Sequence, residues 1–506
     1  MSGTLRDVLA RHLARQPDRP LLVAPETGRT LSYRELDHQA RLLARWLRAA
    51  GLGRGNKVGL YLPNGYQSAV LFLGAMIGGY VIAPLNLLAQ RAQLAYVLAH
   101  CDCKVLFTSR EHEPALAEAL ALVGRPIEVI VIDADAPALF LDDRLPAGGF
   151  GPIAAEDPAI RLRCVSSAPT GTPKGALLTH RNLIAAAQAV ARWHGLTPDD
   201  RCLSSLPLYH INGQVIATLT PFVSGGSLIA PHRFSVTSWW QQAERHGATW
   251  INLVPTIIAY LLNAADASRS YRFARVRFGR SASAPLPPEQ HRAFEKTFGI
   301  PVIEAMGMTE SASVVFANPQ SARKRKYGSP GVPCGVQARV IDLATGRVLP
   351  PNAPGEICLR GPNVMAAYYK SPEQTAKAFD EAGWLRTGDL GLRDADGYYF
   401  ITGRLKELII KGGEKIAPRE IDEALIRHPA VLEAAAVGVP DANYGQDIVA
   451  CVVLKPGARA ASDELRAFCL AELGRYKTPR EFRFLAELPK GPSGKVQRLK
   501  LAALAQ

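Results

Sequence analysis

Short apolar, β-branched runs alternate with helical segments along the first part of this chain. Four such runs are KVGLYLP (57–63), YVIAPLN (80–86), KVLFTS (104–109) and IEVIVID (127–133), separated by Ala-, Leu- and Arg-rich segments. Apolar strands joined by helices are typical of parallel sheets that are buried on both faces. The pattern predicts an α/β fold in which loops at the strand ends carry the function.

The composition is that of a folded globular protein. The chain has 506 residues, more than one hydrophobic core usually serves, and 48% of them are hydrophobic. Its formal net charge of +14 is spread along the sequence and no nucleic-acid-binding module is recognisable. We therefore expect small anionic substrates and no nucleic acid, although a solvated basic surface explains most of the excess charge. A monomer and a homodimer both remain open.

Cysteine usage and apolar stretches indicate a cytoplasmic protein. The eight cysteines form no CxxC pair, which favours reduced, structural thiols. The segment MSGTLRDVLARHLARQPDRP (1–20) lacks the apolar core of a secretory signal. The most apolar stretch, 69–85, is interrupted by Gly78, Gly79 and Pro84. It predicts a buried helix followed by a buried strand, with no transmembrane segment.

A loop rich in Ser, Thr and Gly, SSAPTGTPKG (166–175), precedes the helix-like run ALLTHRNLIAAAQAVARW (176–193). Glycine lets backbone N–H groups approach a polyphosphate, and lysine supplies a mobile positive charge. The loop differs from a P-loop because no Ser or Thr follows Lys174. It predicts a nucleotide-binding loop of another fold, and an ordinary surface turn is the alternative.

Four further motifs follow: MGMTES (306–311), GWLRTGDLG (383–391), ITGRLKELIIKGGEKIAPREID (401–422) and PKGPSGKVQR (489–498). In this order and spacing the five motifs resemble the adenylate-forming (AMP-binding) superfamily of acyl-CoA synthetases, peptide-synthetase adenylation domains and luciferases. The resemblance implies a large N-terminal AMP-binding domain of sheet subdomains with flanking helices (1–405) and a small, mobile C-terminal α/β lid (406–506). It places the hinge at Lys406, for which a solvated loop lysine is the alternative.

The resemblance also implies an activity, that of an acid–thiol ligase. A carboxylic acid reacts with ATP to give an acyl-adenylate and pyrophosphate, and the acyl group then passes to coenzyme A. Catalysis of this type consists mostly of positioning and charge stabilisation. A ligase that hands the acyl group to a carrier protein or an amine is one alternative. A weakened nucleotide- or acyl-binding protein is another, because Ala168 and Pro169 depart from the family pattern Ser-Gly-Thr-Thr-Gly.

The resemblance assigns the ATP contacts to residues of these motifs. The expected phosphate contacts are Ser166, Ser167, Thr170, Gly171, Lys174 and Thr309. The expected adenine contacts are Ala282, Ser283, Ala284, Pro285, Met306, Gly307 and Met308. Asp389 is expected at the ribose, Arg404 at the ribose or a phosphate, and Glu310 is expected to hold Mg²⁺. Lys495, on the lid, is expected to reach the α-phosphate and the carboxylate during adenylation.

The remaining expected contacts concern the acid and CoA. His210, Asn212, Gln214 and Ala305 are expected to line the acyl pocket, with His210 also catalytic beside the carboxylate. In an extended segment Asn212 and Gln214 would face the same side. Such a polar lining favours a short acid bearing polar groups, although three tryptophans leave an aromatic acid open. Lys411, Gly412 and Gly413 are expected to border the passage for CoA. The basic run 323–326 either meets the CoA phosphates or is a solvated loop.

Overall fold

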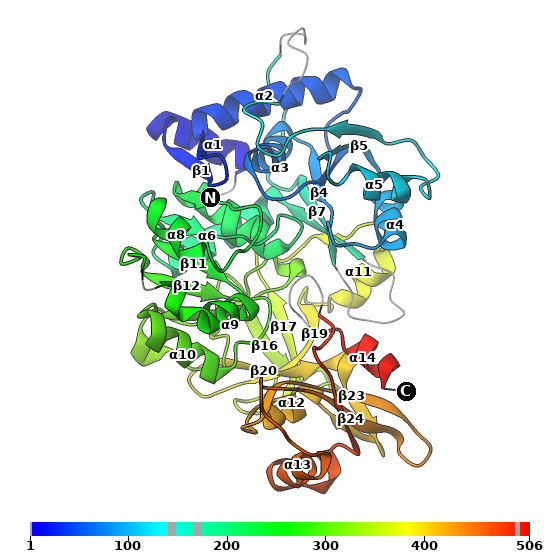
Figure 1. Cartoon of the computed structure of the whole chain (residues 1–506). Helices are drawn as coiled ribbons and strands as arrows, with labels where there is room; N and C mark the ends of the chain where they lie inside the picture. Colours follow the sequence, from blue (N-terminus) through cyan, green and yellow to red (C-terminus); the bar gives the residue numbers. More distant parts are fainter. Residues whose placement is uncertain (1–2, 140–147, 165–173, 269, 491–495, 506) are drawn as a thin grey trace. The chain divides into compact units, whose positions relative to one another are not determined.

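The computed structural model describes residues 3–139, 148–164, 174–268, 270–490 and 496–505, and Figure 1 labels their helices and strands. These residues form two compact units. The first contains the described residues up to 164, those from 174 to 337 and those from 360 to 377. The second contains residues 338–359 and the described residues from 378 onward. The boundary at residue 405 and the hinge at Lys406 stay predictions.

The first unit contains a nine-stranded sheet in the order β15-β14-β13-β12-β11-β9-β10-β1-β2 among the described residues. The strands from β13 to β1 are parallel, and β2, β14 and β15 are antiparallel to their neighbours. In that order their bounds are Val332–Pro333, Phe316–Ala317, Val302–Met306, Phe278–Ser281, Trp250–Leu253, Arg201–Leu203, Ser227–Ile229, Pro20–Ala24 and Arg29–Ser32.

A seven-stranded sheet completes the first unit, in the order β18-β8-β7-β4-β3-β5-β6. In that order the bounds are Ala367–Tyr368, Lys174–Thr179, Pro158–Cys164, Val81–Pro84, Lys57–Tyr61, Cys103–Thr108 and Glu128–Val131. The last four strands are mutually parallel and coincide with the four predicted apolar runs. The α/β prediction is therefore confirmed.

Helices cover these sheets, together with one π-helix and several 3-10 turns. The α-helices are α1 Leu5–Arg15, α2 Tyr33–Ala49, α3 Tyr66–Gly78, α4 Arg91–Cys101, α5 Glu113–Leu120, α6 His180–Trp193, α7 Thr220–Ser224, α8 Trp239–Arg245, α9 Pro255–Asn263, α10 Pro288–Phe298 and α11 Pro372–Ala378. The π-helix is η1 Asn212–Leu219, and the 3-10 turns are η2 Ala265–Ser268, η3 Thr309–Ser311 and η4 Ala322–Lys324. The buried helix α3 and the buried strand β4 confirm the prediction for 69–85.

The sequence suggested a helix over the whole run 176–193, and the structure shows that the first part of this run is a strand. Residues Lys174–Thr179 form β8, which pairs with β7 and β18, and α6 begins only at His180. Thr179 fixes this start, because its Oγ1 accepts a hydrogen bond from the backbone N–H of Asn182, 3.2 Å away. The pairing with two strands outweighs the helical propensity of this short segment.

Helices α8, α9 and α10 pack against one face of the nine-stranded sheet. That face presents Leu203, Ile251, Leu253 and Val302 to the apolar side chains of the three helices. Because side chains alternate along a strand, Asn252 and its register partner in β12, Arg280, lie on the opposite face.

The second unit contains two sheets of its own. The first has the order β16-β17-β19-β20, with bounds Gln337–Ile341, Gly355–Arg360, Leu385–Arg393 and Tyr399–Arg404. The second has the order β22-β21-β24-β23, with bounds Glu414–Ile416, Ile409–Lys411, Gly445–Leu454 and Val431–Asp441, and β25 (Glu481–Phe484) pairs with β24. The remaining elements are η5 Leu405–Glu407, α12 Pro418–Ile426, α13 Ser462–Lys477 and α14 Arg498–Leu504.

No helix among the described residues combines the length and the apolar composition that crossing a bilayer requires. The cysteines whose side chains are described form no disulfide and are all buried. Burial raises the pKa of the Cys334 and Cys469 thiols to about 11. These thiols are structural, as the sequence predicted.

Candidate functional site

Two predicted ATP-binding segments lie at the carboxyl ends of neighbouring parallel strands. Residues 281–285 end β12, and residues 305–310 end β13 and continue into η3. The register pairs Ser281 with Glu304, so the two segments leave the sheet side by side. Crevices at the carboxyl ends of parallel strands are where α/β folds bind ligands.

The segment 281–285 is held in a strained conformation. Ser283 has a φ of +76°, which an L-residue rarely adopts. Its Oγ accepts a hydrogen bond from the Asn212 amide at 3.1 Å. The buried Glu304 carboxylate accepts the backbone N–H of Leu286 at 3.2 Å. The sequence reasoning missed Glu304, whose position two residues before Met306 was the available signal.

The turn after β13 depends on one glycine. A Cβ on Gly307 would lie 1.0 Å from the carbonyl oxygen of Ser313, so no other residue fits this close approach. The buried Asn363 amide donates to the carbonyls of Ser311 and Val314, at 2.9 Å each. These contacts fix the turn that carries Thr309 and Glu310. Asn363 was also missed, because its partners lie about fifty residues away.

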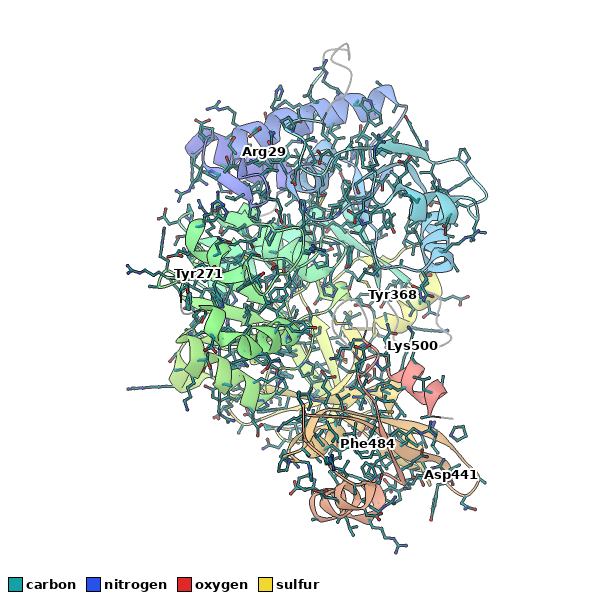
Figure 2. All side chains as sticks on the ribbon, in the orientation of Figure 1. Arg29, Tyr271, Tyr368, Asp441, Phe484 and Lys500 are labelled. Atoms are coloured by element: carbon teal, nitrogen blue, oxygen red, sulfur yellow. The ribbon has the colours of Figure 1, made fainter. Side chains whose placement is uncertain are left out.

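Tyr368, labelled in Figure 2, contacts both the predicted phosphate lysine and the predicted metal carboxylate. Its hydroxyl donates to Oε1 of Glu310 at 2.8 Å, and Nζ of Lys174 lies 4.8 Å from the centre of its ring. Lys174 also donates to Gln374 at 2.6 Å. β18, which carries Tyr368, pairs with β8, which begins at Lys174. The fold thus brings Lys174 and Glu310 into contact with the same side chain, Tyr368, and their assigned roles stay predictions.

The surroundings of Glu310 fit a magnesium ion that is shared with substrate phosphates. The described residues contain no cluster of three or more His, Cys, Asp or Glu that would form an all-protein metal site. Mg²⁺ usually binds through one or two carboxylates together with phosphate oxygens, so a single Glu suffices. The Tyr368 hydroxyl occupies a lone pair on Oε1 and orients the carboxylate.

Several predicted contacts lie outside the described residues. They are Ser166, Ser167, Thr170, Gly171 and Lys495, together with the substituted positions Ala168 and Pro169. Their assignments stay predictions.

One of the predicted acyl-pocket residues, Asn212, belongs to a chain of side-chain hydrogen bonds. The Asn252 amide donates to Ser204 at 3.3 Å and to Asn212 at 3.0 Å, and the Asn212 amide donates to Ser283. All four residues come from different elements or loops. Asn252 and Ser204 were missed, since each stands in a segment that is otherwise apolar or small.

Asn212 and Gln214 do not lie in an extended segment. They begin the π-helix η1, in which residues two apart point in different directions. Gln214 is fully buried and its amide donates to the carbonyl of Leu208, so it does not share the face of Asn212. Nδ1 of His210 accepts the backbone N–H of Asn212 at 3.2 Å, so the neutral ring carries its proton on Nε2. Ala305 is buried in β13.

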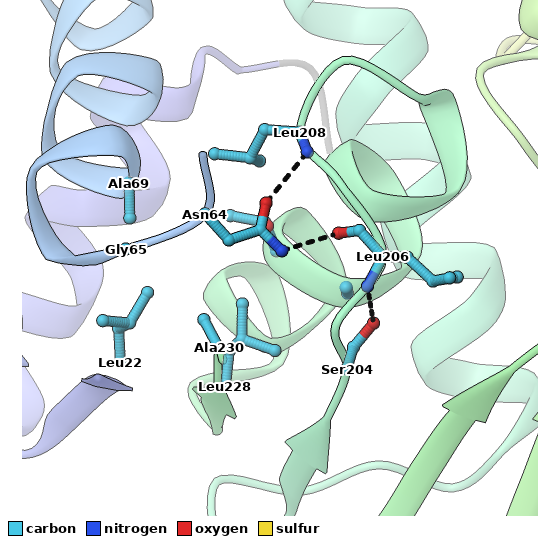
Figure 3. A pocket seen from close by; sticks show the side chains of 11 residues that line it. Leu22, Asn64, Gly65, Ala69, Ser204, Leu206, Leu208, Leu228 and Ala230 are labelled. Carbon is cyan, nitrogen blue, oxygen red and sulfur yellow. Dashed lines mark hydrogen bonds between the residues drawn. The ribbon is translucent and has the colours of Figure 1, made fainter. Parts of the chain in front are cut away.

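A small pocket adjoins this hydrogen-bond chain at Ser204 (Figure 3). Leu22, Ala69 and Leu228 supply apolar walls. Asn64 links the loop before α3 to the segment that leads to His210, because its amide donates to the carbonyl of Leu206 and its Oδ1 accepts the N–H of Leu208, both at 3.1 Å. Asn64 therefore positions the segment that precedes His210, the predicted catalytic histidine.

The second unit brings together the predicted ribose contacts. Asp389 and Arg404 are register partners in β19 and β20, and Arg404 Nε lies 2.8 Å from Oδ1 of Asp389. The Asp389 side chain is only 2% exposed. The buried Glu356 accepts the backbone N–H of Gly388 at 3.1 Å, which supports the turn before Asp389.

The predicted CoA contacts form a tight hairpin turn. Gly412 and Gly413 connect β21 to β22 with φ values of +54° and +87°, as a two-residue turn of this hand requires. Lys411 forms a largely buried ion pair with Asp447 at 2.5 Å. Lys406 is exposed in η5, and its neighbour Glu407 lies 3.4 Å from Arg498 of α14.

Comparisons with known proteins agree with this arrangement. The family model "AMP-binding enzyme" matches residues 9–369, and that of the "AMP-binding enzyme C-terminal domain" matches residues 420–495. A sulfoacetate–CoA ligase from Cupriavidus necator is 56% identical over 501 residues, covering 98% of this chain and 97% of that protein. An oxalate–CoA ligase from Arabidopsis thaliana is 34% identical over 505 residues, covering 98% of each.

A solved structure supports the same assignment. ATP-bound MatB from Rhodopseudomonas palustris is similar with a TM-score of 0.89 and 30% identity, and the match covers 99% of both chains. The protein is therefore an AMP-forming acid–thiol ligase that uses ATP and CoA. This chain belongs to the AMP-binding enzyme family, with the fold of adenylate-forming enzymes.

Proposed function

We propose that this ligase activates a short acid that carries a second anionic group, with sulfoacetate as the first candidate. The observation that carries the proposal is the 56% identity to a sulfoacetate–CoA ligase over 98% of this chain. The 34% identity to an oxalate–CoA ligase supports the same substrate class. The chain of buried amides and hydroxyls through Asn252, Asn212 and Ser283 supports a polar acid over an aliphatic one.

For the first half-reaction, the proposed roles follow the site geometry. Lys174, Thr309 and the loop 166–171 bind the phosphates, and Glu310, oriented by Tyr368, holds Mg²⁺ against them. A bound Mg²⁺ supplies charge neutralisation at the phosphates. Asp389 accepts hydrogen bonds from the ribose hydroxyls, since it already has its charge compensated by Arg404. The segments 282–285 and 306–308 flank the adenine.

For the carboxylate itself, His210 and Lys495 supply the positive and hydrogen-bonding groups. With Nδ1 engaged by the Asn212 N–H, a neutral His210 has Nε2–H as its donor toward the acid. Lys495 neutralises charge as the carboxylate attacks the α-phosphate.

The second half-reaction uses a different orientation of residues 406–506. We propose that Lys406 is the hinge and that Lys411, Gly412 and Gly413 border the CoA passage. The ion pair between Glu407 and Arg498 ties the residue after the hinge to the end of the 489–498 motif. The two segments that must move together are thereby connected.

A cytoplasmic location completes the proposal. It is supported by the absence of disulfides among the described cysteines, which suits a reducing compartment.

The test is an acid panel with identification of the products. Purified protein is incubated with ATP, Mg²⁺, CoA and one acid, and AMP and acyl-CoA are measured. We expect CoA-dependent AMP release with sulfoacetate and a sulfoacetyl-CoA product by mass spectrometry. Acetate, octanoate and benzoate serve as comparison acids. Equal or greater activity with any of these, or AMP release that needs a carrier protein or an amine in place of CoA, would contradict the proposal.

A further inference from the structure

Arg280 is a buried arginine whose guanidinium has no partner in the part of the chain that the structure describes. It lies in β12, one residue before the segment 281–285, and is only 1% exposed. Its Nε, Nη1 and Nη2 all lack a hydrogen-bond partner within the described residues. A guanidinium has five N–H donors and remains protonated in proteins. This position therefore places an uncompensated positive charge in the protein interior.

Arg280 lies on the same sheet face as the predicted acyl pocket. It is the register partner of Asn252 in the parallel pair of β11 and β12, and register partners project to the same face. The Asn252 amide contacts Asn212 of η1 on that face. The apolar neighbours Ile251 and Leu253 project to the other face, against α8, α9 and α10.

The ionisable groups that interact with Arg280 are neutral. They are His194, which follows α6, Cys202 in β9, and Cys334. Burial lowers the pKa of His194 well below its usual value and raises the pKa of Cys202 far above its usual value. Burial lowers the pKa of Arg280 only to about 10, so the guanidinium keeps its charge at neutral pH. No carboxylate is among these interacting groups.

An uncompensated buried cation is costly to a folded protein unless a ligand supplies the missing anion. A sulfonate or a carboxylate matches the planar, paired donors of a guanidinium. The acids named for the relatives carry such a group beside the carboxyl that is activated.

We propose that Arg280 is the specificity residue that binds the second anionic group of the acid. This assignment rests on the proposed function. Because the described residues supply no anion to this guanidinium, the pairing forms only with an acid that brings one. An acid without the second group leaves the guanidinium unpaired, which gives strong discrimination against it.

The experiment compares sulfoacetate with acetate, which lacks the sulfonate. We expect Arg280→Gln to lower kcat/KM for sulfoacetate about 100-fold and to change kcat/KM for acetate less than about threefold. Arg280→Lys keeps the charge but loses the paired donors, so we expect a loss of about tenfold for sulfoacetate. Arg272→Gln removes an exposed positive charge eight residues earlier and is the matched control, with both acids unchanged.

Thermal unfolding separates ligand binding from a structural role. Removal of an unpaired charge breaks no hydrogen bond, so free Arg280→Gln should unfold at the same temperature as the wild type or higher. Sulfoacetate should raise the Tm of the wild type and not that of the variant. A structural arginine would instead lower the Tm of the free variant. If Arg280→Gln does not fold, its structural role is shown and the assignment fails unless Arg280→Lys folds and shows the selective loss.

The outcomes distinguish the two proposals. A wild type that prefers sulfoacetate, with an Arg280→Gln variant that keeps this preference, would overturn the assignment of Arg280 alone. A wild type that prefers acetate and shows no Tm shift with sulfoacetate would overturn the proposed function and the assignment together.

Discussion

Two arginines with little solvent exposure, one in each compact unit, differ in their surroundings: Arg280 is 1% exposed, and the Arg498 side chain is 17% exposed. Arg498, in the second unit, contacts the carboxylates of Asp422 and Glu407 and donates to the carbonyl of Ala436 at 2.7 Å. Arg280, in the first unit, has no hydrogen-bond partner among the described residues. The Arg498 guanidinium is thus paired by protein groups in an internal network, whereas the Arg280 guanidinium is not paired by any described residue.

The difference separates structural from ligand-binding charge. A buried cation that the protein itself pairs contributes to folding and needs no ligand. A buried cation that it leaves unpaired destabilises the free protein, and such strain is characteristic of functional sites. By this criterion Arg498 stabilises the second unit, and Arg280 is available to bind a substrate anion.

The largest expected effect comes from breaking this internal network. Asp422→Asn removes the negative charge nearest to Arg498 and leaves the more distant carboxylate of Glu407, so we expect the free energy of unfolding to fall by about 3–5 kcal/mol. Urea denaturation measures this change. Glu472→Gln, which breaks the exposed pair with Arg427, is the control and should change stability by less than about 0.5 kcal/mol. Equal effects of both substitutions would remove the distinction between the two arginines.

A second pair in the same unit tests a charge that is both paired and functional. Asp389→Asn keeps the shape of the side chain but removes the charge opposite Arg404 and one strong acceptor for the ribose. We expect kcat/KM for ATP to fall about 100-fold, with a much smaller change in the KM for CoA. ATP–pyrophosphate exchange measures the first half-reaction. Glu381→Gln, at an exposed position, is the control. An unchanged KM for ATP would show that this pair is structural only.

The hydrogen bond from the Tyr368 hydroxyl to Glu310 offers a test with a smaller expected effect in the first unit. Tyr368→Phe removes the hydrogen bond that orients Oε1, and we expect the Mg²⁺ concentration for half-maximal activity to rise about tenfold. The matched control is Tyr369→Phe, since that neighbouring hydroxyl bonds to Asp102. A similar shift in both variants would mean that Tyr368 acts through packing.

His180 differs from the two arginines, because burial keeps its side chain neutral. Burial lowers the pKa of His180 from 6.5 to about 4, so the unfolded chain binds a proton in this range that the folded chain does not. Stability should therefore fall with acidification, by about 1 kcal/mol between pH 6 and pH 5 from this residue. The difference between the wild type and His180→Gln in urea denaturation at the two pH values isolates it. Parallel pH profiles would contradict this account.

Local patterns were sufficient to predict much of the fold. The four apolar runs form parallel strands, and Gly78 and Gly79 mark the end of α3 before β4. The start of α6 was wrong because β8 is stabilised by β7 and β18, and pairing with distant strands leaves no local signal.

The site was predictable where a motif carries the residue and obscure where a distant partner does. Lys174 and Glu310 both stand in recognisable motifs, yet Tyr368, which contacts each of them, comes from a segment with no chemical signature. The π-helix at Asn212 has no recognisable sequence pattern. Arg280 stands in RFGRSASAP, which gives no indication that its guanidinium is buried and unpaired. Burial and pairing are properties of the fold, and only the structure reveals them.

A crystal structure of the protein with AMP and sulfoacetate tests the central claim most directly. We expect the sulfonate to accept hydrogen bonds from two N–H groups of Arg280, with N···O distances of about 2.7–2.9 Å. The carboxylate should face His210 and the α-phosphate. A sulfonate bound away from Arg280, with the guanidinium still unpaired in the complex, would contradict the account.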